Sequence, residues 1–380
     1  MKIYRSLAEV PRDFAPSALT IGNFDGVHYG HRQILRRVRA IAEANGWKPS
    51  VLTFNPHPTR VVAPDRTPPL LTTLESRVEL MQEEGIDQVL ILPFTLELAQ
   101  LSPEDFVTRI LVGALGARAV LVGDNFRFGH KHAGTVALLT DLGRRLGFTV
   151  EIVPAVKCRG RIVSSTGIRD LIRAGRVDLA ARFLLHPYAL EGEVVRGRGV
   201  GSKQTVPTLN LATTAEVLPA RGVYITRTSS ISAPSATSAP SNPMEEELGS
   251  SHPGTQKPEK APRIRTDAAT LTSSQISASP RLRVEAQSPS LEPLRPSLTN
   301  IGYRPTFADT PDLSIETFLL DPLEGDPPTH IRVEFLRRVR DERKFDSPEG
   351  LRAQIVKDVA AANRYFRRLR AWTGRQCISC

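Results

Sequence analysis

The strongest constraint on the fold is the regular alternation of short apolar runs with amphipathic segments over the first 185 of the 380 residues. Such runs predict buried strands, and segments with helical periodicity between them predict helices. The expected strands are residues 18–21, 50–54, 88–92, 119–122 and 149–153, and the expected helices are 31–45, 73–84, 102–115 and 135–146. Strands alternating with helices indicate a doubly wound α/β domain with a parallel sheet. Such sheets bind ligands at the carboxyl ends of their strands.

The pattern changes after Pro187, where short strand-like runs are separated by Gly and Pro. These runs are residues 190–195, 223–227, 314–320 and 331–336, and a helix over 348–368 closes the chain. The second half therefore predicts a small β-barrel or sandwich with a terminal helix. We expect two domains, residues 1–185 and 186–375.

A tract over about residues 229–296 interrupts the second domain. It is rich in Ser, Pro, Ala and Thr, and no aromatic residue occurs between Tyr224 and Tyr303. Such a segment cannot bury enough apolar surface to offset its ordering entropy. We expect a disordered insertion between two strands, which a barrel tolerates because long loops add little closure entropy.

The chain shows no signal for export or for a membrane. No apolar stretch approaches the roughly 18–20 residues that span a bilayer, and the first residues lack a signal-peptide core. The expected location is the cytoplasm, with no membrane partner. Cys158 stands alone. Cys377 and Cys380 lack a second ligand pair for zinc, so we interpret this pair as part of an incidental, disordered end.

The formal net charge of +10 raises the possibility of a nucleic-acid partner. The arginines, however, lie largely on the polar faces of the helices expected at 31–45 and 348–368, and no nucleic-acid-binding motif is visible. A solvated helix face explains them, and anionic phosphate substrates suit a basic enzyme equally well. We expect no nucleic-acid partner; the oligomeric state stays open.

The densest cluster of chemically informative residues follows the first predicted strand, at residues 22–31. Its glycines allow close backbone approach, and the N-terminus of the following helix attracts phosphate. His28 and His31 are three residues apart, so both can point at one anion. Because no nucleophile is present, the cluster suits charge stabilisation of a phosphate under in-line attack.

A second anion-binding pattern begins a short helix at residues 163–169. Ser164, Ser165 and Thr166 supply hydroxyl groups, and Arg169 supplies a guanidinium for phosphate oxygens. An ordinary N-cap would explain one hydroxyl, but not three hydroxyls followed by an arginine.

These motifs resemble a known family. His28-Tyr29-Gly30-His31 is similar to the H-x-G-H signature of nucleotidyltransferases, and residues 163–169 resemble that superfamily's second signature. With residues 53–58 and 123–129, they resemble the FAD synthetase half of prokaryotic bifunctional riboflavin kinase/FAD synthetases. The resemblance implies a Rossmann-like domain in which FMN attacks the α-phosphorus of ATP with Mg²⁺ present and pyrophosphate leaves.

The resemblance also implies roles for individual residues. His28, His31, Ser164 and Arg169 would bind and activate the ATP phosphates. Further ATP-binding residues would be Gly22, Phe24, Asp25, Asn125, Ser165 and Thr166. The flavin would lie beside Pro56, His57, Pro58 and Asn125.

The second half resembles the riboflavin kinase domain, which implies a Greek-key β-barrel with a terminal helix. The similarity lies in residues 192–201, 207–211, 299–307, 315–321 and 340–345. It implies that Thr208 and Asn210 bind Mg²⁺ and ATP, and that Glu316 is the general base for the riboflavin 5′-hydroxyl. Backbone groups of a glycine loop would wrap the ATP phosphates, helped by a lysine: Gly197, Gly199, Gly201 and Lys203.

Two departures leave an alternative open. Residues 202–206 lack the Gly-Phe pair of the family loop, and Leu209 replaces its alanine. The inserted tract after Tyr224 is the second departure. An FAD synthetase with a weak or inactive kinase half is therefore an alternative. An aminoacyl-tRNA synthetase is disfavoured because no lysine-rich second signature occurs. A basic RNA-binding module remains the non-enzymatic hypothesis, and it predicts salt-sensitive RNA binding.

Overall fold

The computed structural model describes residues 1–195, 208–231, 294–303, 313–321, 323 and 326–376. The glycine loop at 197–203, most of the predicted insertion and the cysteines at 377 and 380 lie outside the described residues. Among the described helices, none combines the length and apolarity needed to cross a membrane.

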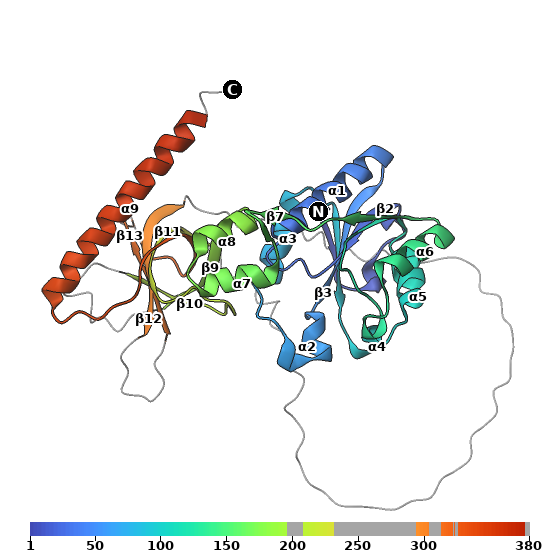
Figure 1. Cartoon of the computed structure of the whole chain (residues 1–380), viewed down its shortest axis with the longest axis horizontal. Coiled ribbons are helices and arrows are strands. Elements are labelled where there is room, and N and C mark those ends of the chain that lie inside the picture. The colour runs from blue at the N-terminus through green and yellow to red at the C-terminus, as the bar shows by residue number, and fades with distance from the viewer. Residues whose placement is uncertain (196–207, 232–293, 304–312, 322, 324–325, 377–380) are drawn as a thin grey trace, which may run out of the picture. The chain divides into compact units, whose positions relative to one another are not determined.

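The N-terminal half contains the predicted parallel sheet (Figure 1). Its strand order is β1-β4-β3-β2-β5-β6, and all neighbours are parallel. The strands are β1 (Lys2–Tyr4), β2 (Ser17–Ile21), β3 (Lys48–Asn55), β4 (Gln88–Pro93), β5 (Ala117–Gly123) and β6 (Thr149–Val153). The five predicted strands are confirmed, and β1 joins them beside β4.

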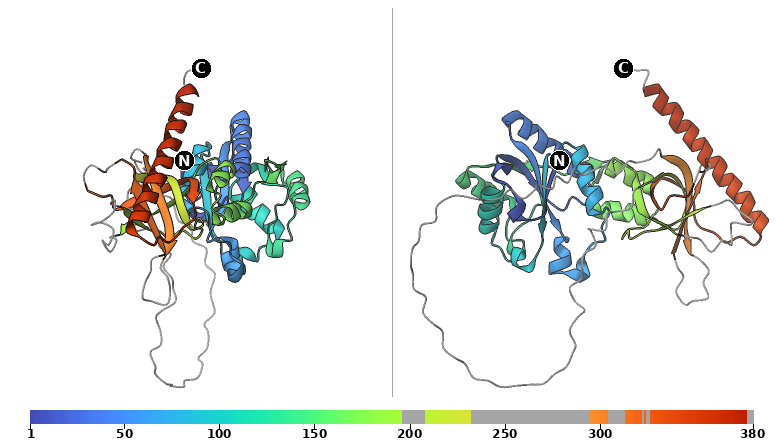
Figure 2. Two further views of the ribbon diagram at one scale, coloured as in Figure 1. Left: turned by 60° about the vertical axis from the view of Figure 1, so that its left-hand side comes forward. Right: turned by 180° about the vertical axis from the view of Figure 1, so that it is seen from behind.

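Helices cover both faces of this sheet, as two views show (Figure 2). Side chains alternate along β2, so Leu19 and Ile21 enter one buried cluster and Ala18 enters the other. The longer helices are α1 (Tyr29–Asn45), α3 (Leu74–Glu83), the π-helix η4 (Phe106–Ala114) after α5 (Pro103–Asp105), and α6 (Val136–Leu146). Shorter ones are η1 (Leu7–Glu9), η2 (Arg12–Phe14), α2 (Pro58–Val62), η3 (Pro64–Arg66), α4 (Leu96–Ala99) and η5 (His130–His132).

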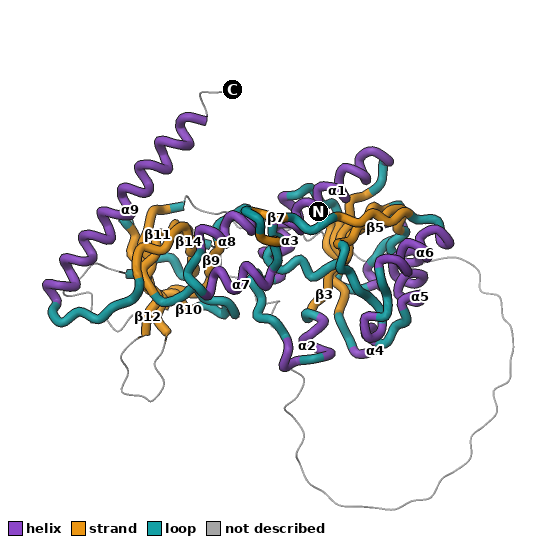
Figure 3. Tube along the Cα trace, in the orientation of Figure 1, coloured by secondary structure: helices purple, strands orange, loops and turns teal. Residues whose placement is uncertain are grey.

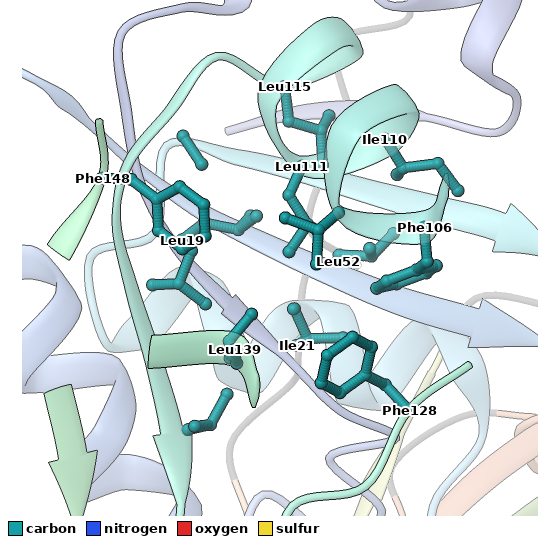
Figure 4. Close-up of a cluster of buried hydrophobic side chains, with 14 of the residues drawn as sticks. Leu19, Ile21, Leu52, Phe106, Ile110, Leu111, Leu115, Phe128, Leu139 and Phe148 are labelled. Atoms are coloured by element: carbon teal, nitrogen blue, oxygen red, sulfur yellow. The ribbon is translucent and has the colours of Figure 1, made fainter. Parts of the chain in front are cut away.

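The segment expected as a helix over 102–115 is helical, but most of it is the π-helix η4. Its amide groups bond to the fifth residue back, as Leu115 N does to Ile110 O at 3.0 Å. The wider turn suits apolar residues spaced four to five apart, and it brings Phe106, Ile110, Leu111 and Leu115 to the core. Figure 4 shows them around Leu19, Ile21 and Leu52, with Phe128, Leu139 and Phe148.

The order of the strands reverses between β2 and β5. The chain passes from β2 to β3 on one side, whereas β5 pairs with β2 on the other side. The carboxyl ends of β3, β2 and β5 therefore lie side by side at a topological switch point, where ligands bind in this class of sheet.

Past β6 come β7 (Lys157–Cys158), β8 (Arg161–Ile162), α7 (Ser165–Arg173) and α8 (Val177–Leu184). One buried cluster contains Ile172 of α7 and Phe183 of α8 together with the barrel residues Tyr188 and Phe335.

The second half forms a closed antiparallel barrel with the order β10-β13-β12-β11-β14-β9 (Figure 3). The strands are β9 (Tyr188–Val195), β10 (Leu209–Ala212), β11 (Gly222–Ser230), β12 (Arg295–Tyr303), β13 (Leu313–Leu319) and β14 (His330–Arg340). The predicted terminal helix is α9 (Pro348–Gln376). β11 and β12 pair with each other, so the predicted insertion joins neighbouring strands; residues 229–230 and 295–296 at its edges belong to them.

The barrel interior is partly polar. Five buried hydroxyl groups form a chain of hydrogen bonds of 2.8–3.0 Å across β11, β12 and β13. The chain runs through Thr228, Ser297, Thr226, Thr299 and Thr317. On the outer face, Val223, Ile225 and Leu298 pack against α9.

Candidate active sites

Two histidines lie at the start of α1, the first helix after β2 along the chain. His28 is the N-cap residue, and its Nδ1 accepts a hydrogen bond from His31 N at 3.3 Å. The two rings stack with centroids 3.6 Å apart, and Phe24 meets the His31 ring edge-on at 5.1 Å. An added Cβ at Gly30 would meet the His28 ring at 3.3 Å, so a glycine leaves space for this stack.

Burial keeps both imidazoles neutral. It lowers the pKa of His28 to about 4, opposed weakly by nearby Asp25. Burial also lowers the pKa of His31 well below its usual value, and the neighbouring His28 and Arg77 lower it further. His31 Nδ1 is buried and has no hydrogen-bond partner among the described residues.

Asp25 is a buried carboxylate that joins three segments. It accepts hydrogen bonds from Leu71 N at 2.9 Å and Thr72 N at 3.2 Å. Arg169 donates to it at 2.6 Å and also donates to Pro69 O, and Arg77 lies 3.9 Å away. Asp25 was predicted to contact ATP; in this structure its oxygens hold Arg169 and the chain at residues 71–72.

The start of α7 meets the same cluster. Ser164 is the N-cap, accepting from Gly167 N at 3.2 Å, and Ser165 Oγ donates to the Asp25 carbonyl at 3.0 Å. Arg169, one turn into α7, completes the contact through its ion pair. The structure therefore brings the N-termini of α1 and α7 together, although residues 28 and 164 are far apart in sequence.

The expected flavin side begins where β3 ends. His57 is the N-cap of α2; its Nδ1 lies 2.7 Å from Thr59 Oγ1, and its Nε2 lies 2.8 Å from Asn23 Nδ2. The Pro56-His57-Pro58 segment is thus tied to the segment after β2. Asn125 follows β5 and is exposed. Gly22 and Phe24 lie in the loop before α1, and Thr166 lies in the first turn of α7.

Sequence reasoning missed two residues of this site. Arg77 is buried on α3 close to Asp25, and Asn23 bonds His57. Burial lowers the pKa of Arg77, against the opposing effect of Asp25. Asn23 stands inside the quoted motif and could have been singled out, whereas nothing local marks Arg77.

A polar row crosses three strands on the outer face of the barrel. Asn210 on β10 and Asn300 on β12 both lie directly opposite Glu316 on β13. Directly opposed residues project on the same face of a sheet. Ser314 donates to Glu316 at 2.9 Å, whereas Ile315 and Thr317 face the interior. Glu316 is half-buried, and Thr208 is exposed just before β10.

The donor set of this row suits Mg²⁺ better than a transition metal. Among the described residues, no three His, Cys, Asp or Glu side chains are grouped to hold a metal. Thr208, Asn210 and Glu316 instead offer hydroxyl, amide and carboxylate oxygens. Mg²⁺ takes few protein oxygens when phosphates and water complete its shell. The other residues predicted for this site, Gly197, Gly199, Gly201 and Lys203, lie outside the described residues.

Comparison with known proteins supports the family expected for each half of the chain. Residues 10–167 match the family model for FAD synthetase, and residues 184–366 match that for riboflavin kinase. A bifunctional riboflavin kinase/FMN adenylyltransferase from Pseudomonas fluorescens is 32% identical, over 95% of this chain and 97% of its own. One from Escherichia coli K12 is 30% identical, over 96% and 98%.

A solved structure described as a macrolide-efflux protein from Streptococcus pneumoniae shares the fold. Its TM-score is 0.70 at 22% identity, covering 95% of this chain and 98% of that one. The chain belongs to the bifunctional riboflavin kinase/FMN adenylyltransferase family, an enzyme family whose two domains convert riboflavin to FMN and FMN to FAD.

Proposed function

We propose that adenylyl transfer takes place where the N-termini of α1 and α7 meet. The observation that carries this assignment is the contact between Asp25, Arg169 and Ser165, which joins both helix N-termini beside the stacked histidines. Two helix N-termini, two imidazoles and a guanidinium form a site for a polyphosphate. FMN phosphate would attack the α-phosphorus of ATP in line, and pyrophosphate would leave.

The hydrogen bond at His28 gives this residue a defined role. Because its Nδ1 accepts from His31 N, the neutral ring carries its proton on Nε2. His28 would donate that proton in a hydrogen bond to a phosphate oxygen as charge develops on it. His31, whose Nδ1 has no described partner, would make a second contact. Ser164 and Arg169 would hold the remaining phosphates, and Asn125 and His57 would border the flavin.

In the barrel, Glu316 would accept the proton of the riboflavin 5′-hydroxyl as that oxygen attacks the γ-phosphorus of ATP, with ADP leaving. Its position between Asn210 and Asn300 supports this role, since two amides can orient the carboxylate and bound hydroxyl groups. Thr208 and Asn210 would hold Mg²⁺, which when bound neutralises charge on the ATP phosphates. Gly197, Gly199, Gly201 and Lys203 would wrap those phosphates.

The proposal includes a cytoplasmic location, where ATP is available, and no nucleic-acid partner. The basic surface is then explained by anionic substrates.

Isotope labelling tests the two chemistries separately. The protein is supplied with riboflavin, Mg²⁺ and ATP labelled on either the α- or the γ-phosphate. We expect the γ label in FMN and the α label only in FAD. Labelled FAD formed from FMN supplied directly, with no labelled product formed from riboflavin, would favour the alternative of an FAD synthetase with an inactive kinase half. Label in neither product would refute the assignment of both sites.

A further inference from the structure

A cavity of about 480 Å³ lies between the terminal helix and the barrel, away from the residues assigned above. It is lined by the middle of α9, the end of β14 and one residue of β11. We call it the α9 groove; its lining consists of Ile225, Arg337, Arg338, Val339, Ala361, Arg364, Tyr365, Arg368 and Leu369. Its volume falls within the roughly 300–1,000 Å³ of small-molecule sites.

Three arginines of the α9 groove have no ion-pair partner among the residues that the structure describes. Arg337, Arg364 and Arg368 are exposed, and none of them makes an ion pair with a residue that the structure describes. Neighbouring arginines behave differently: Arg338 pairs with Asp341 at 2.9 Å, and Arg340 pairs with Asp358 at 2.9 Å. The groove therefore gathers three positive charges that no described residue neutralises through an ion pair.

The floor of the α9 groove is apolar and includes an aromatic ring. Ile225, Val339 and Leu369 belong to, or pack against, the cluster that holds α9 on the barrel. Tyr365 is half-buried, and its ring lies edge-on to that of Phe366 at a centroid distance of 5.6 Å. An aromatic side chain bordered by guanidinium groups that lack a described ion-pair partner can stack a flat ring while the arginines bind an attached phosphate.

The groove is separate from the polar row around Glu316. That row crosses β10, β13 and β12, whereas the groove lies over β14 and β11. In the barrel order β12 and β11 are neighbours, and α9 packs on their outer face between the two sites.

We propose that the α9 groove binds a phosphorylated molecule with a flat aromatic ring, a nucleotide of the flavin or adenine kind. Charge complementarity selects the phosphate, the apolar floor and Tyr365 select the ring, and the limited volume favours one small molecule over a long polyanion. Such molecules are substrates and products of the two reactions, so the groove can sense their concentration in the same protein.

Calorimetric titration of the full chain with FMN or ADP tests the proposal, because the two ligands distinguish a flavin site from an adenine site. We expect the double variant Arg364→Glu/Arg368→Glu to lose one class of sites, with affinity there at least about tenfold weaker. Arg367→Glu is the matched control, since Arg367 is exposed on the same helix but does not line the groove. Riboflavin and pyrophosphate, which lack the phosphate or the ring, should each bind the groove more weakly.

Hydrogen exchange locates the site independently. FMN or ADP should protect the peptide covering residues 361–369 in the wild type and in Arg367→Glu, but not in the double variant. Equal stoichiometry in all three proteins, together with no protection of this peptide, would overturn the proposal. Binding of a polyuridine RNA that depends on Arg364 and Arg368, with no FMN or ADP bound in the groove, would overturn it in favour of a polyanion surface.

Discussion

Removal of the Asp25 carboxylate is expected to destabilise the N-terminal domain strongly. The Arg169 and Arg77 side chains around it are only 8% and 4% exposed. Asp25→Ala leaves both guanidinium groups buried without their acid, a loss that costs about 3–5 kcal/mol when a buried pair is broken. At roughly 2–4 °C per kcal/mol for a domain of this size, the melting temperature should fall by about 6–20 °C.

Thermal unfolding followed by circular dichroism measures this shift. Asp25→Asn should fall between wild type and Asp25→Ala, because its amide oxygen can still accept from Leu71 N. Glu151→Gln is the control: Glu151 also pairs with an arginine, Arg37, but at the surface, so its loss should leave the unfolding curve unchanged within error. An Asp25→Ala melting temperature within 2–3 °C of wild type, well below the roughly 6 °C minimum expected, would refute the view that this carboxylate joins the two helix N-termini.

Three further results are expected. Gly30→Ala should slow FAD formation from FMN without lowering the melting temperature, because the new Cβ crowds the His28 ring while alanine favours the helix; an unchanged rate would contradict the role of the stack. Thr299→Val should lower the free energy of unfolding in urea by about 1–3 kcal/mol, because buried Thr226 and Thr317 each lose a partner, and a neutral effect would contradict it. His28 has a pKa of about 4 in the folded protein, so between pH 6.5 and 4 the His28 side chain binds a proton only in the unfolded chain. The free energy of unfolding should therefore fall as the pH drops through that window. The fall should be smaller in His28→Asn.

The parallel sheet was predictable because its central strands are mostly apolar runs. Ala18–Ile21 of β2 and its neighbours are buried on both faces, so their sequence carries no polar alternation. Strand β1 has three residues and gives no such signal. Strand β12 was missed because two of its interior positions, Ser297 and Thr299, are fully buried hydroxyl residues. Polar residues at interior positions hide a strand from any argument based on hydrophobicity.

The residues proposed for adenylyl transfer could be singled out because they stand in short local motifs. His28 and His31 share one helical turn, and Ser164 and Arg169 are the N-cap and a second-turn residue of one short helix. The link between these turns is a tertiary contact through Asp25, which no local pattern reveals. Arg77 shows the limit clearly: on α3 its sequence context is that of an ordinary surface arginine, yet only 4% of its side chain is exposed.

Product analysis from riboflavin and from FMN tests the central claim, that two separate sites carry out the two reactions. Wild type, His28→Ala and Glu316→Gln are each incubated with ATP and Mg²⁺, after circular dichroism has shown that the variants are folded. The account predicts that His28→Ala stops at FMN, and that Glu316→Gln makes FAD from FMN but nothing from riboflavin. A folded variant that loses both reactions, or one that makes FAD from riboflavin at the wild-type rate, would contradict it.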